Sequence, residues 1–359
     1  MRLAGFTLTP FRLPLRAPWR NSRGTHRERR GWLITLNTRE GLTGHGECAP
    51  LPAAGTETPP QARHWLQRRL ACLPGRGVEE TLAGLPPADG CPAARCALET
   101  ALLDLLSQAA GQPLRRWLEP DAGDRVRLNA ALGAAGGELA VMARGVLSEG
   151  FKTLKIKVGT APPARELGRI RDLVRALPAG IRLRLDANRA WTAGQAERFV
   201  EGLASLPVES LEEPLATPEP GTLARLQALA RFDIALDESL SDQDLERLLA
   251  DPPIRRIVLK PPARGGLLPA LELARRARAA SLTCIVTSCL DAAVGIWAAA
   301  QLAAAVDLPA GQAHGLATSG WFRQDIGAPP PPGRGQFILP ERPGLGFSSP
   351  HPATAGAGP

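Results

Sequence analysis

The sequence predicts an α/β fold in which a (β/α)8-type barrel follows a smaller α+β domain. From Arg127 onward, short apolar segments typical of strands alternate with helical stretches. Five consecutive strand segments end in a charged residue, at intervals of 29, 26, 25 and 23 residues: Lys157, Asp186, Glu212, Asp237 and Lys260. Intervals of this length fit one β/α unit, and eight such units indicate a closed barrel.

The first third of the chain has the pattern of a mixed α+β unit. Leu3–Arg12 and Trp32–Asn37 alternate apolar and polar residues, as half-buried strands do. The glycine-rich segment 41–47 is typical of a turn, and the arginine-rich segment Arg20–Arg30 is expected to be a loop between the strands. From about Pro59 to Leu118 the apolar spacing predicts helices.

The change of pattern predicts three parts of the chain. We expect the α+β domain at residues 1–122, the barrel at residues 123–320 and a C-terminal segment at residues 321–359. The last residues, His351–Pro359, are expected to be disordered. The eight predicted barrel strands are Arg127–Leu132, Thr153–Val158, Ile181–Asp186, Ser210–Glu213, Ile234–Asp237, Arg256–Lys260, Thr283–Thr287 and Gly315–Thr318.

Alternation within these strands indicates which side chains enter the barrel. In a barrel strand, successive residues face the helices and the interior in turn. The helix-facing phase is apolar, as in Leu154, Ile156 and Val158. The interior phase carries charged and polar residues: Lys155, Lys157, Arg184, Asp186, Ser210, Glu212, Asp237 and Lys260. An exposed strand face of a β-sandwich is the alternative for any one of them, but five successive strands in the same phase favour the barrel.

Composition excludes several other classes of protein. With 44% apolar and 22% charged residues the chain is typical of a globular protein, and no apolar run approaches the length of a membrane span. The first residues do not resemble a signal peptide, so the cytoplasm is the expected location. The six cysteines form no C-x-x-C pair, and the histidines form no zinc motif. The net charge of +8 would suit nucleic-acid binding, but no reading motif accompanies it.

Lysine is rare in this arginine-rich chain. Only four of the 43 cationic side chains are lysine, at Lys152, Lys155, Lys157 and Lys260. Because a desolvated lysine can lose its proton near neutral pH and arginine cannot, these positions are candidates for acid–base chemistry. Three of the four lie in the interior phase of the predicted barrel strands.

The charged interior residues suit one kind of chemistry. Asp186, Glu212 and Asp237 offer hard oxygen ligands on neighbouring strands, as Mg²⁺ prefers, with Mn²⁺ as the alternative. Lys155 and Lys157 precede this triad in strand order, and Lys260 follows it. A nearby divalent cation should lower the pKa of such a lysine toward the range of a general base. The arrangement predicts removal of a proton next to a metal-bound carboxylate.

Several motifs resemble the enolase superfamily, in its muconate-cycloisomerase-type branch. They are Leu154-Lys155-Ile156-Lys157-Val158-Gly159, the run from Arg182 to Thr192, Leu211-Glu212-Glu213-Pro214, Asp237-Glu238-Ser239-Leu240 and Val258-Leu259-Lys260-Pro261. Gly44-His45-Gly46-Glu47 resembles a motif of that branch's N-terminal capping domain, and residues 343–347 resemble a tail that folds back onto that domain. The run from Asp186 to Thr192 is most similar to the o-succinylbenzoate synthases. The implied fold is a modified (β/α)7β barrel with a capping domain.

The resemblance implies a role for each site residue. Asp186, Glu212 and Asp237 would bind Mg²⁺, and Lys157 would take the α-proton of a small dicarboxylate and return it to the departing hydroxyl. Lys260 would stabilise the enediolate as a cation, with Lys155 and Arg184 in support. Thr287 and Ser288 would contact a substrate carboxylate, although Cys289 departs from the serine-rich pattern of the branch. The implied reaction is the syn dehydration of 2-succinyl-6-hydroxy-2,4-cyclohexadiene-1-carboxylate to 2-succinylbenzoate, a lyase step of menaquinone biosynthesis.

Two other activities of the same branch remain open. An N-acylamino-acid racemase or a dipeptide epimerase would use the same lysines on opposite faces of an α-carbon. Dipeptide epimerases usually carry an Asp-x-Asp in the eighth strand to hold an ammonium group, and Leu316-Ala317-Thr318 offers none. The sequence does not indicate an oligomeric state, and a monomer is compatible with it.

Overall fold

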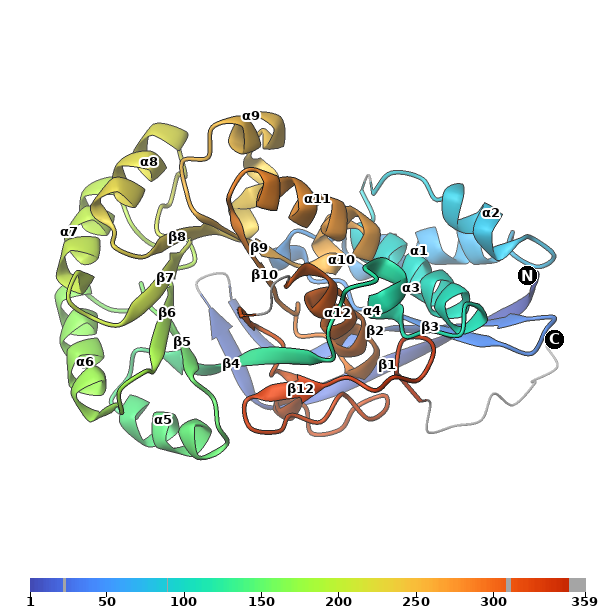
Figure 1. Ribbon diagram of the computed structural model, residues 1–359, viewed down its shortest axis with the longest axis horizontal. Coiled ribbons are helices and arrows are strands. Elements are labelled where there is room, and N and C mark those ends of the chain that lie inside the picture. The colour runs from blue at the N-terminus through green and yellow to red at the C-terminus, as the bar shows by residue number, and fades with distance from the viewer. Residues whose placement is uncertain (22–23, 89, 308–310, 349–359) are drawn as a thin grey trace.

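The computed structural model describes residues 1–21, 24–88, 90–307 and 311–348. The chain begins with a three-stranded antiparallel sheet of β1 (Leu3–Asn21), β2 (Gly24–Thr38) and β3 (Thr43–Cys48), as Figure 1 shows. The segment 41–47, predicted as a turn, therefore lies mostly within β3. Two of its glycines, Gly44 and Gly46, allow a helix to pack closely against β3 and do not form a turn.

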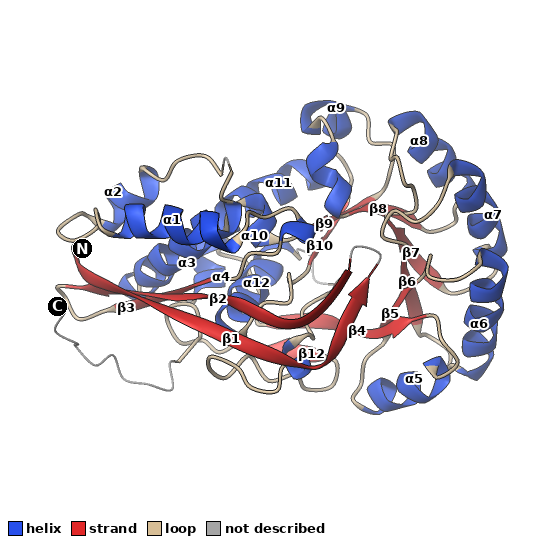
Figure 2. Cartoon of the chain, turned by 180° about the vertical axis from the view of Figure 1, so that it is seen from behind, coloured by secondary structure: helices blue, strands red, loops and turns tan. Residues whose placement is uncertain are grey.

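The prediction of a loop at Arg20–Arg30 was wrong. The hairpin of β1 and β2 continues to Asn21 paired with Gly24, and its far end reaches toward the barrel strands in Figure 2. The register shifts between Pro14 and Trp19, where β1 has more residues than its partner, and such bulges bend a strand. Charged side chains made the segment look solvated, whereas backbone pairing between the two strands determines its structure.

Four helices complete the first part of the molecule: α1 (Pro59–Leu70), α2 (Val78–Ala83), α3 (Pro92–Ala109) and α4 (Leu114–Leu118). Helix α3 packs against β3 so closely that a Cβ atom at Gly44 would overlap the carbonyl of Ala101, and one at Gly46 that of Ala97. Only glycine allows this approach. The Gly-x-Gly of the sequence motif thus fixes the distance between sheet and central helix.

A barrel of parallel strands follows, with a helix after each of its first seven strands. The strands run in the order β10-β9-β8-β7-β6-β5-β4-β11, and helices α5 to α9 and α11 curve around their outer side in Figure 1. This is the predicted (β/α)7β arrangement. The elements are β4 (Arg125–Ala134), α5 (Leu139–Ser148), β5 (Thr153–Lys157), α6 (Pro163–Ala176), β6 (Arg182–Asp186), α7 (Ala193–Leu203), β7 (Val208–Glu212), α8 (Pro220–Leu229), β8 (Asp233–Leu236), α9 (Leu245–Ala250), β9 (Arg256–Leu259), α10 (Pro261–Arg264), α11 (Leu267–Ala279), β10 (Thr283–Val286), α12 (Ala293–Val306) and β11 (Ala313–His314).

The eighth strand lies earlier in the chain than predicted. β11 covers only Ala313–His314, and the predicted strand Gly315–Thr318 is a loop beyond its end. The backbone N–H of Gly315 donates to the carbonyl of Val286 at 2.9 Å, which closes the barrel between β10 and β11. Of the residues beyond β11, Leu316 is fully buried in the main core, whereas Gly315, Ala317 and Thr318 line a pocket at the mouth of the barrel.

The C-terminal segment returns to the first part of the molecule. After β12 (Gln336–Ile338), which pairs with β4, the carbonyl of Gly344 accepts a hydrogen bond from the N–H of Leu114 at 2.9 Å. The N–H of Leu345 donates to Asp104 of α3 at 2.8 Å. The domain boundaries at residues 122 and 320 stay a prediction. His351–Pro359, predicted to be disordered, lie outside the described residues.

The barrel strands bury their apolar phase against the helices. Leu154 and Ile156 of β5 and Leu183 and Leu185 of β6 are fully buried in the main core. Burial of a leucine-sized side chain contributes roughly 1.5–3 kcal/mol, so this phase fixes which residues face inward. Within the described part of the chain, no helix is both long and apolar enough to cross a membrane.

Candidate active site

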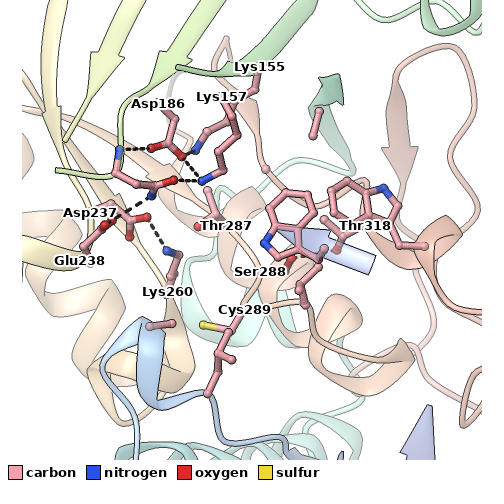
Figure 3. Close-up of a pocket in the computed structure, with 18 of the residues that line it drawn as sticks. Lys155, Lys157, Asp186, Asp237, Glu238, Lys260, Thr287, Ser288, Cys289 and Thr318 are labelled. Atoms are coloured by element: carbon pink, nitrogen blue, oxygen red, sulfur yellow. Dashed lines mark hydrogen bonds and ion pairs between the residues drawn. The ribbon is translucent and has the colours of Figure 1, made fainter. Parts of the chain in front are cut away.

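A pocket opens at the carboxyl ends of the barrel strands, under the β1–β2 hairpin. Side chains from the strands form its floor, and Trp19, Leu51, Ala53 and Ala54 of the first part of the molecule form a wall. Figure 3 shows the pocket lysines with Asp186, Asp237 and Glu238 on one side, and Ser288 and Thr318 on the other, with Thr287 between them. The chemistry predicted from the sequence is therefore gathered in one cavity, with walls from both ends of the chain.

Lys157 lies beside Asp186 because β5 and β6 pair in register at these two residues. Its Nζ donates to Oδ2 of Asp186 at 3.0 Å and to the side-chain carbonyl of Asn188. The ring centre of Trp19 is 5.7 Å from the same Nζ, within the range of a cation–π contact. Lys157 thus sits between a carboxylate and the aromatic wall of the pocket.

Lys155 lies one layer deeper on the same strand. Its Nζ is 2.7 Å from Oε2 of Glu212 and 3.0 Å from Oδ2 of Asp186, so it bridges two of the predicted metal ligands. Only the alternating phase of β5 brings both lysines to the interior, as the sequence predicted.

Lys260 approaches from the opposite side of the triad. It follows β9, which three carboxylate-bearing strands separate from β5, and its Nζ forms an ion pair with Asp237. Figure 3 shows this pair apart from the pair of Lys157 with Asp186. The two lysines therefore face the pocket from different directions.

Asp186, Glu212 and Asp237 have the donor chemistry of a Mg²⁺ site. All three are at least nine-tenths buried, at the ends of three neighbouring strands. Among the described residues, no three His, Cys, Asp or Glu side chains stand ready to enclose a metal, because lysine ammonium groups approach these carboxylates instead. The ammonium of Lys155 shows that a cation fits between Asp186 and Glu212.

Electrostatics also favour an added cation here. Burial and repulsion from Asp186 raise the pKa of Glu212 to about 8, against the attraction of Lys155. A buried carboxyl whose charged form is this disfavoured lacks sufficient positive charge around it. A divalent cation would supply that charge, so the residues present fit the metal.

The prediction that a bound divalent cation lowers the pKa values of the pocket lysines stays a prediction. Burial acts to lower the pKa of Lys155, but attraction to Asp186 and Glu212 outweighs it and raises the pKa. Asp237 does the same for Lys260. The expectation assumed that a divalent cation neutralises these carboxylates. Without that cation each lysine is the main counter-charge of its partner.

Arg184 does not line the pocket. It points into the lower part of the barrel, where its guanidinium donates to Glu209 at 2.7 Å and to the carbonyl of Ala313. Arg256 donates to the same Glu209 at 2.6 Å. Arg184 thus belongs to an ion-pair network beneath the pocket and does not contact the space where a substrate would bind. The sequence could not show this, because the alternation along a strand predicts that a side chain faces the barrel interior but not how far it lies from the mouth.

Thr287 and Ser288 line the pocket as predicted, together with Cys289. Oγ of Ser288 is 2.8 Å from Oγ1 of Thr318, which the sequence analysis did not select. Oγ1 of Thr287 is buried and has no hydrogen-bond partner among the described residues. An unpaired buried hydroxyl that lines a pocket is suited to a ligand oxygen.

Sequence reasoning also missed the aromatic wall and Asn188. The ring centres of Trp19 and Trp321 are 4.1 Å apart, although some 300 residues separate the two tryptophans in the chain. No local pattern predicts such a contact. The position of Asn188 could have been selected from the sequence, because it lies two residues beyond the predicted ligand Asp186. In the structure it adopts φ +44, a left-handed conformation that asparagine tolerates.

Comparison with known families agrees with this geometry. The model described as "Enolase C-terminal domain-like" matches residues 138–351, and that of the "Mandelate racemase / muconate lactonizing enzyme, N-terminal domain" matches residues 5–118. The chain therefore belongs to the enolase superfamily, in its muconate cycloisomerase branch. It is an enzyme of that superfamily, and its first part corresponds to the capping domain.

Individual relatives differ in activity. The chain is 30% identical to a hydrophobic dipeptide epimerase of Enterococcus faecalis over 76% of this chain and 78% of the relative. It is 32% identical to the o-succinylbenzoate synthase of Thermosynechococcus vestitus over 63% and 66%. The structure of a dipeptide epimerase from Methylococcus capsulatus, complexed with Mg and a dipeptide, has a TM-score of 0.87 at 28% identity, covering 97% of this chain and 99% of that one.

Proposed function

We propose that this enzyme is an o-succinylbenzoate synthase, a Mg²⁺-dependent lyase of menaquinone biosynthesis. The observation that carries the proposal is the kind of side chain that lines the pocket on the side away from Asp186, Glu212 and Asp237. There it presents the hydroxyls of Thr287, Ser288 and Thr318 beside apolar and aromatic walls. The loop after β11 contributes Gly315, Ala317 and Thr318, and no carboxylate. Such a surface suits a ring with carboxylates and does not suit an ammonium group.

Asp186, Glu212 and Asp237 would hold the Mg²⁺. When bound, the metal would withdraw charge from a substrate carboxylate and so make the neighbouring α-proton more acidic. Solved relatives of this branch contain Mg, which supports this assignment.

Lys157 is the proposed base, and its Nζ would accept the α-proton. In a syn elimination the same Nζ then donates that proton to the departing hydroxyl, so that water leaves and the ring becomes aromatic. Lys157 suits both steps because it lines the pocket beside Trp19, which shields it from solvent. Lys260 remains protonated on the other side, where its charge stabilises the anion that forms.

Thr287 and Ser288 would bind the second carboxylate. Thr287 has an unpaired buried hydroxyl, and Ser288 shares a hydrogen bond with Thr318. Apolar contacts from Trp19, Trp321 and Leu51 would hold the ring. These contacts orient the α-carbon toward Lys157.

An N-succinyl-amino-acid racemase is the second candidate. The lysines on two sides of the triad favour it, because racemisation needs one base for each face of the α-carbon. An acylated amine carries no ammonium, so the pocket described above also accommodates this substrate class. A relative 23% identical over 82% of this chain, from Bacillus cereus, is an N-succinyl-L-Arg/Lys racemase.

A comparison of three substrate classes tests the proposal. With Mg²⁺ present, the enzyme should dehydrate 2-succinyl-6-hydroxy-2,4-cyclohexadiene-1-carboxylate with a kcat/KM at least about a hundredfold above its values for N-succinyl amino acids and dipeptides. Absorbance reports the dehydration, and deuterium exchange at the α-carbon reports racemisation or epimerisation. Turnover of dipeptides alone would refute the proposal.

A further inference from the structure

The loop that carries Thr287 and Ser288 has a strained backbone. It connects β10 to α12 over residues 287–292, and Leu290 within it adopts φ +58. A bulky residue seldom takes this left-handed conformation, and its cost is about 1 kcal/mol or more. Neighbouring contacts must therefore hold the loop in this form.

Three charged side chains that contact the backbone at residues 289–292 contribute to this. Arg29 of β2 donates from Nε to the carbonyl of Leu290 at 3.1 Å, and Asp291 accepts the N–H of Cys289 at 3.0 Å. Glu47 of β3 accepts the N–H of Ala292 at 2.6 Å and that of Gly295 at 2.7 Å. Two of the three belong to the capping domain, so this domain holds a loop of the barrel.

Glu47 and Asp291 are close-packed carboxyls. Both pack on Gly295, where a Cβ atom would lie 2.6 Å from Cβ of Asp291 and 3.2 Å from Oε2 of Glu47. Glu47 is 8% exposed and Asp291 is 3% exposed. Two buried carboxyls so placed favour one charge between them.

The groups around Glu47 and Asp291 do not fully compensate a negative charge on both carboxyls at once. Burial and repulsion from Asp291 raise the pKa of Glu47 to about 8, with Asp325 of the C-terminal segment adding to the repulsion. Burial likewise raises the pKa of Asp291, against the attraction of Arg29 from β2 and Lys260 from the end of β9. Further titratable neighbours are the thiols of Cys48 in β3, Cys96 in α3 and Cys289 in the loop, and burial raises the pKa of each.

We propose that Glu47 is a positioning residue for substrate binding: it holds the strained loop 287–292 so that Thr287 and Ser288 face the substrate carboxylate. The inference rests on the proposed function for the identity of that carboxylate. Glu47 itself touches no substrate, since it lies behind the loop at the start of α12. Loss of the last proton from this pair of carboxyls places two negative charges beside Gly295, so substrate affinity decreases as the pH rises past about 8.

The variant Glu47→Gln tests this role. Its amide nitrogen cannot accept a hydrogen bond, so one of the two backbone N–H groups loses its partner. We expect KM to rise about tenfold and kcat to change less than about threefold, as loss of one buried hydrogen bond from the binding loop requires. The rise of wild-type KM above pH 8 should also disappear in this variant.

Glu99→Gln is the matched control. Glu99 is a fully buried carboxylate of the capping domain that likewise accepts a backbone N–H from a barrel helix, that of Leu268 at 3.0 Å. It belongs to α3 and contacts the start of α11, away from loop 287–292. The Glu99→Gln substitution should lower Tm and leave KM near the wild-type value.

Hydrogen exchange separates this inference from the proposed function, because it needs no turnover. In the full-length, substrate-free protein, Glu47→Gln should speed exchange in the peptide spanning residues 287–296 about tenfold, and Glu99→Gln should not. Unchanged exchange there, or equal KM effects in both variants, would overturn the positioning role even if the enzyme dehydrates its substrate. Should Glu47→Gln fail to fold, exchange in wild type between pH 6 and 9, corrected for the intrinsic rate, must accelerate above pH 8 or the inference fails.

Discussion

Each pocket lysine contacts at least one carboxylate of the triad. Lys157 contacts Asp186, Lys260 contacts Asp237, and Lys155 bridges Asp186 and Glu212. Lys152, the remaining lysine, is exposed ahead of β5 and has no part in the site. This difference provides an internal comparison, since the same substitution can be made at a pocket lysine and at an exposed one.

Lys157→Arg should abolish most dehydration while the protein stays folded. Arginine keeps the positive charge beside Asp186 but cannot act as a base near neutral pH, so kcat should decrease by about a hundredfold to ten-thousandfold. The measurement is initial rate at saturating substrate, with Tm as the check on folding. Lys152→Arg should retain wild-type turnover, and a Lys157→Arg enzyme as active as that control would exclude Lys157 as the base.

Glu47 should make stability depend on pH. Its folded-state pKa is raised from 4.5 to about 8, so the folded protein retains a proton that the unfolded chain releases. The stabilising contribution is therefore fully present below about pH 4.5, and it is lost as the pH rises to about 8. Denaturant unfolding at pH 5, 7 and 9 should show wild type losing stability relative to Glu47→Gln. Parallel profiles for the two proteins would contradict the raised pKa.

At the scale of the element, the contact between β3 and α3 depends on two glycines. A Cβ at Gly46 would meet the carbonyl of Ala97, which belongs to rigid helical backbone and cannot move aside cheaply. Gly46→Ala should therefore cost about 1–3 kcal/mol or more in free energy of unfolding. Urea denaturation measures the loss. Gly5→Ala in β1, where nothing lies within 4 Å of the added carbon, should stay within about 0.5 kcal/mol of wild type, and equal losses in both would contradict the packing argument.

Sequence pattern predicted the barrel strands well because two independent signals agreed there. The spacing of the charged residues gave the β/α unit, and alternation gave the phase that places Lys157 and Asp186 side by side. The prediction of a strand at Gly315–Thr318 was wrong, because this short segment has no clear alternation of apolar and polar residues from which strand bounds can be predicted. Sequence pattern also failed for Arg20–Arg30, where a two-stranded hairpin carries charged side chains on a backbone that is nevertheless paired.

At the scale of the whole molecule, the site depends on contacts that no local pattern contains. Trp19 reaches the pocket on the hairpin and meets Trp321, and Glu47 reaches the start of α12. Each contact joins segments more than 200 residues apart. Sequence reasoning therefore predicted the residues on the barrel strands and missed those that the capping domain and the C-terminal segment bring to them.

Metal removal should affect both activity and stability of the whole protein. The proposed Mg²⁺ ligands lie at or directly after the ends of β6, β7 and β8, so bound metal ties three strands together. EDTA should therefore abolish turnover, and Mg²⁺ should restore it. At a hundredfold excess over Kd, a single bound ion stabilises the folded state by about 2.7 kcal/mol, so Tm should rise on adding Mg²⁺. Differential scanning fluorimetry measures this shift, with Asp237→Asn as the comparison. Full activity after exhaustive chelation would exclude the metal site.

The pairing of β4 has a consequence for synthesis on the ribosome. This strand pairs with β5 soon after it emerges, but its other barrel neighbour, β11, begins at Ala313. At 5–20 residues per second, translation of the intervening chain takes on the order of ten to forty seconds. During that interval one edge of β4 is open to wrong partners. Half of its ten residues, three alanines, one glycine and one asparagine, have low strand propensity, which reduces that hazard until the chain is complete.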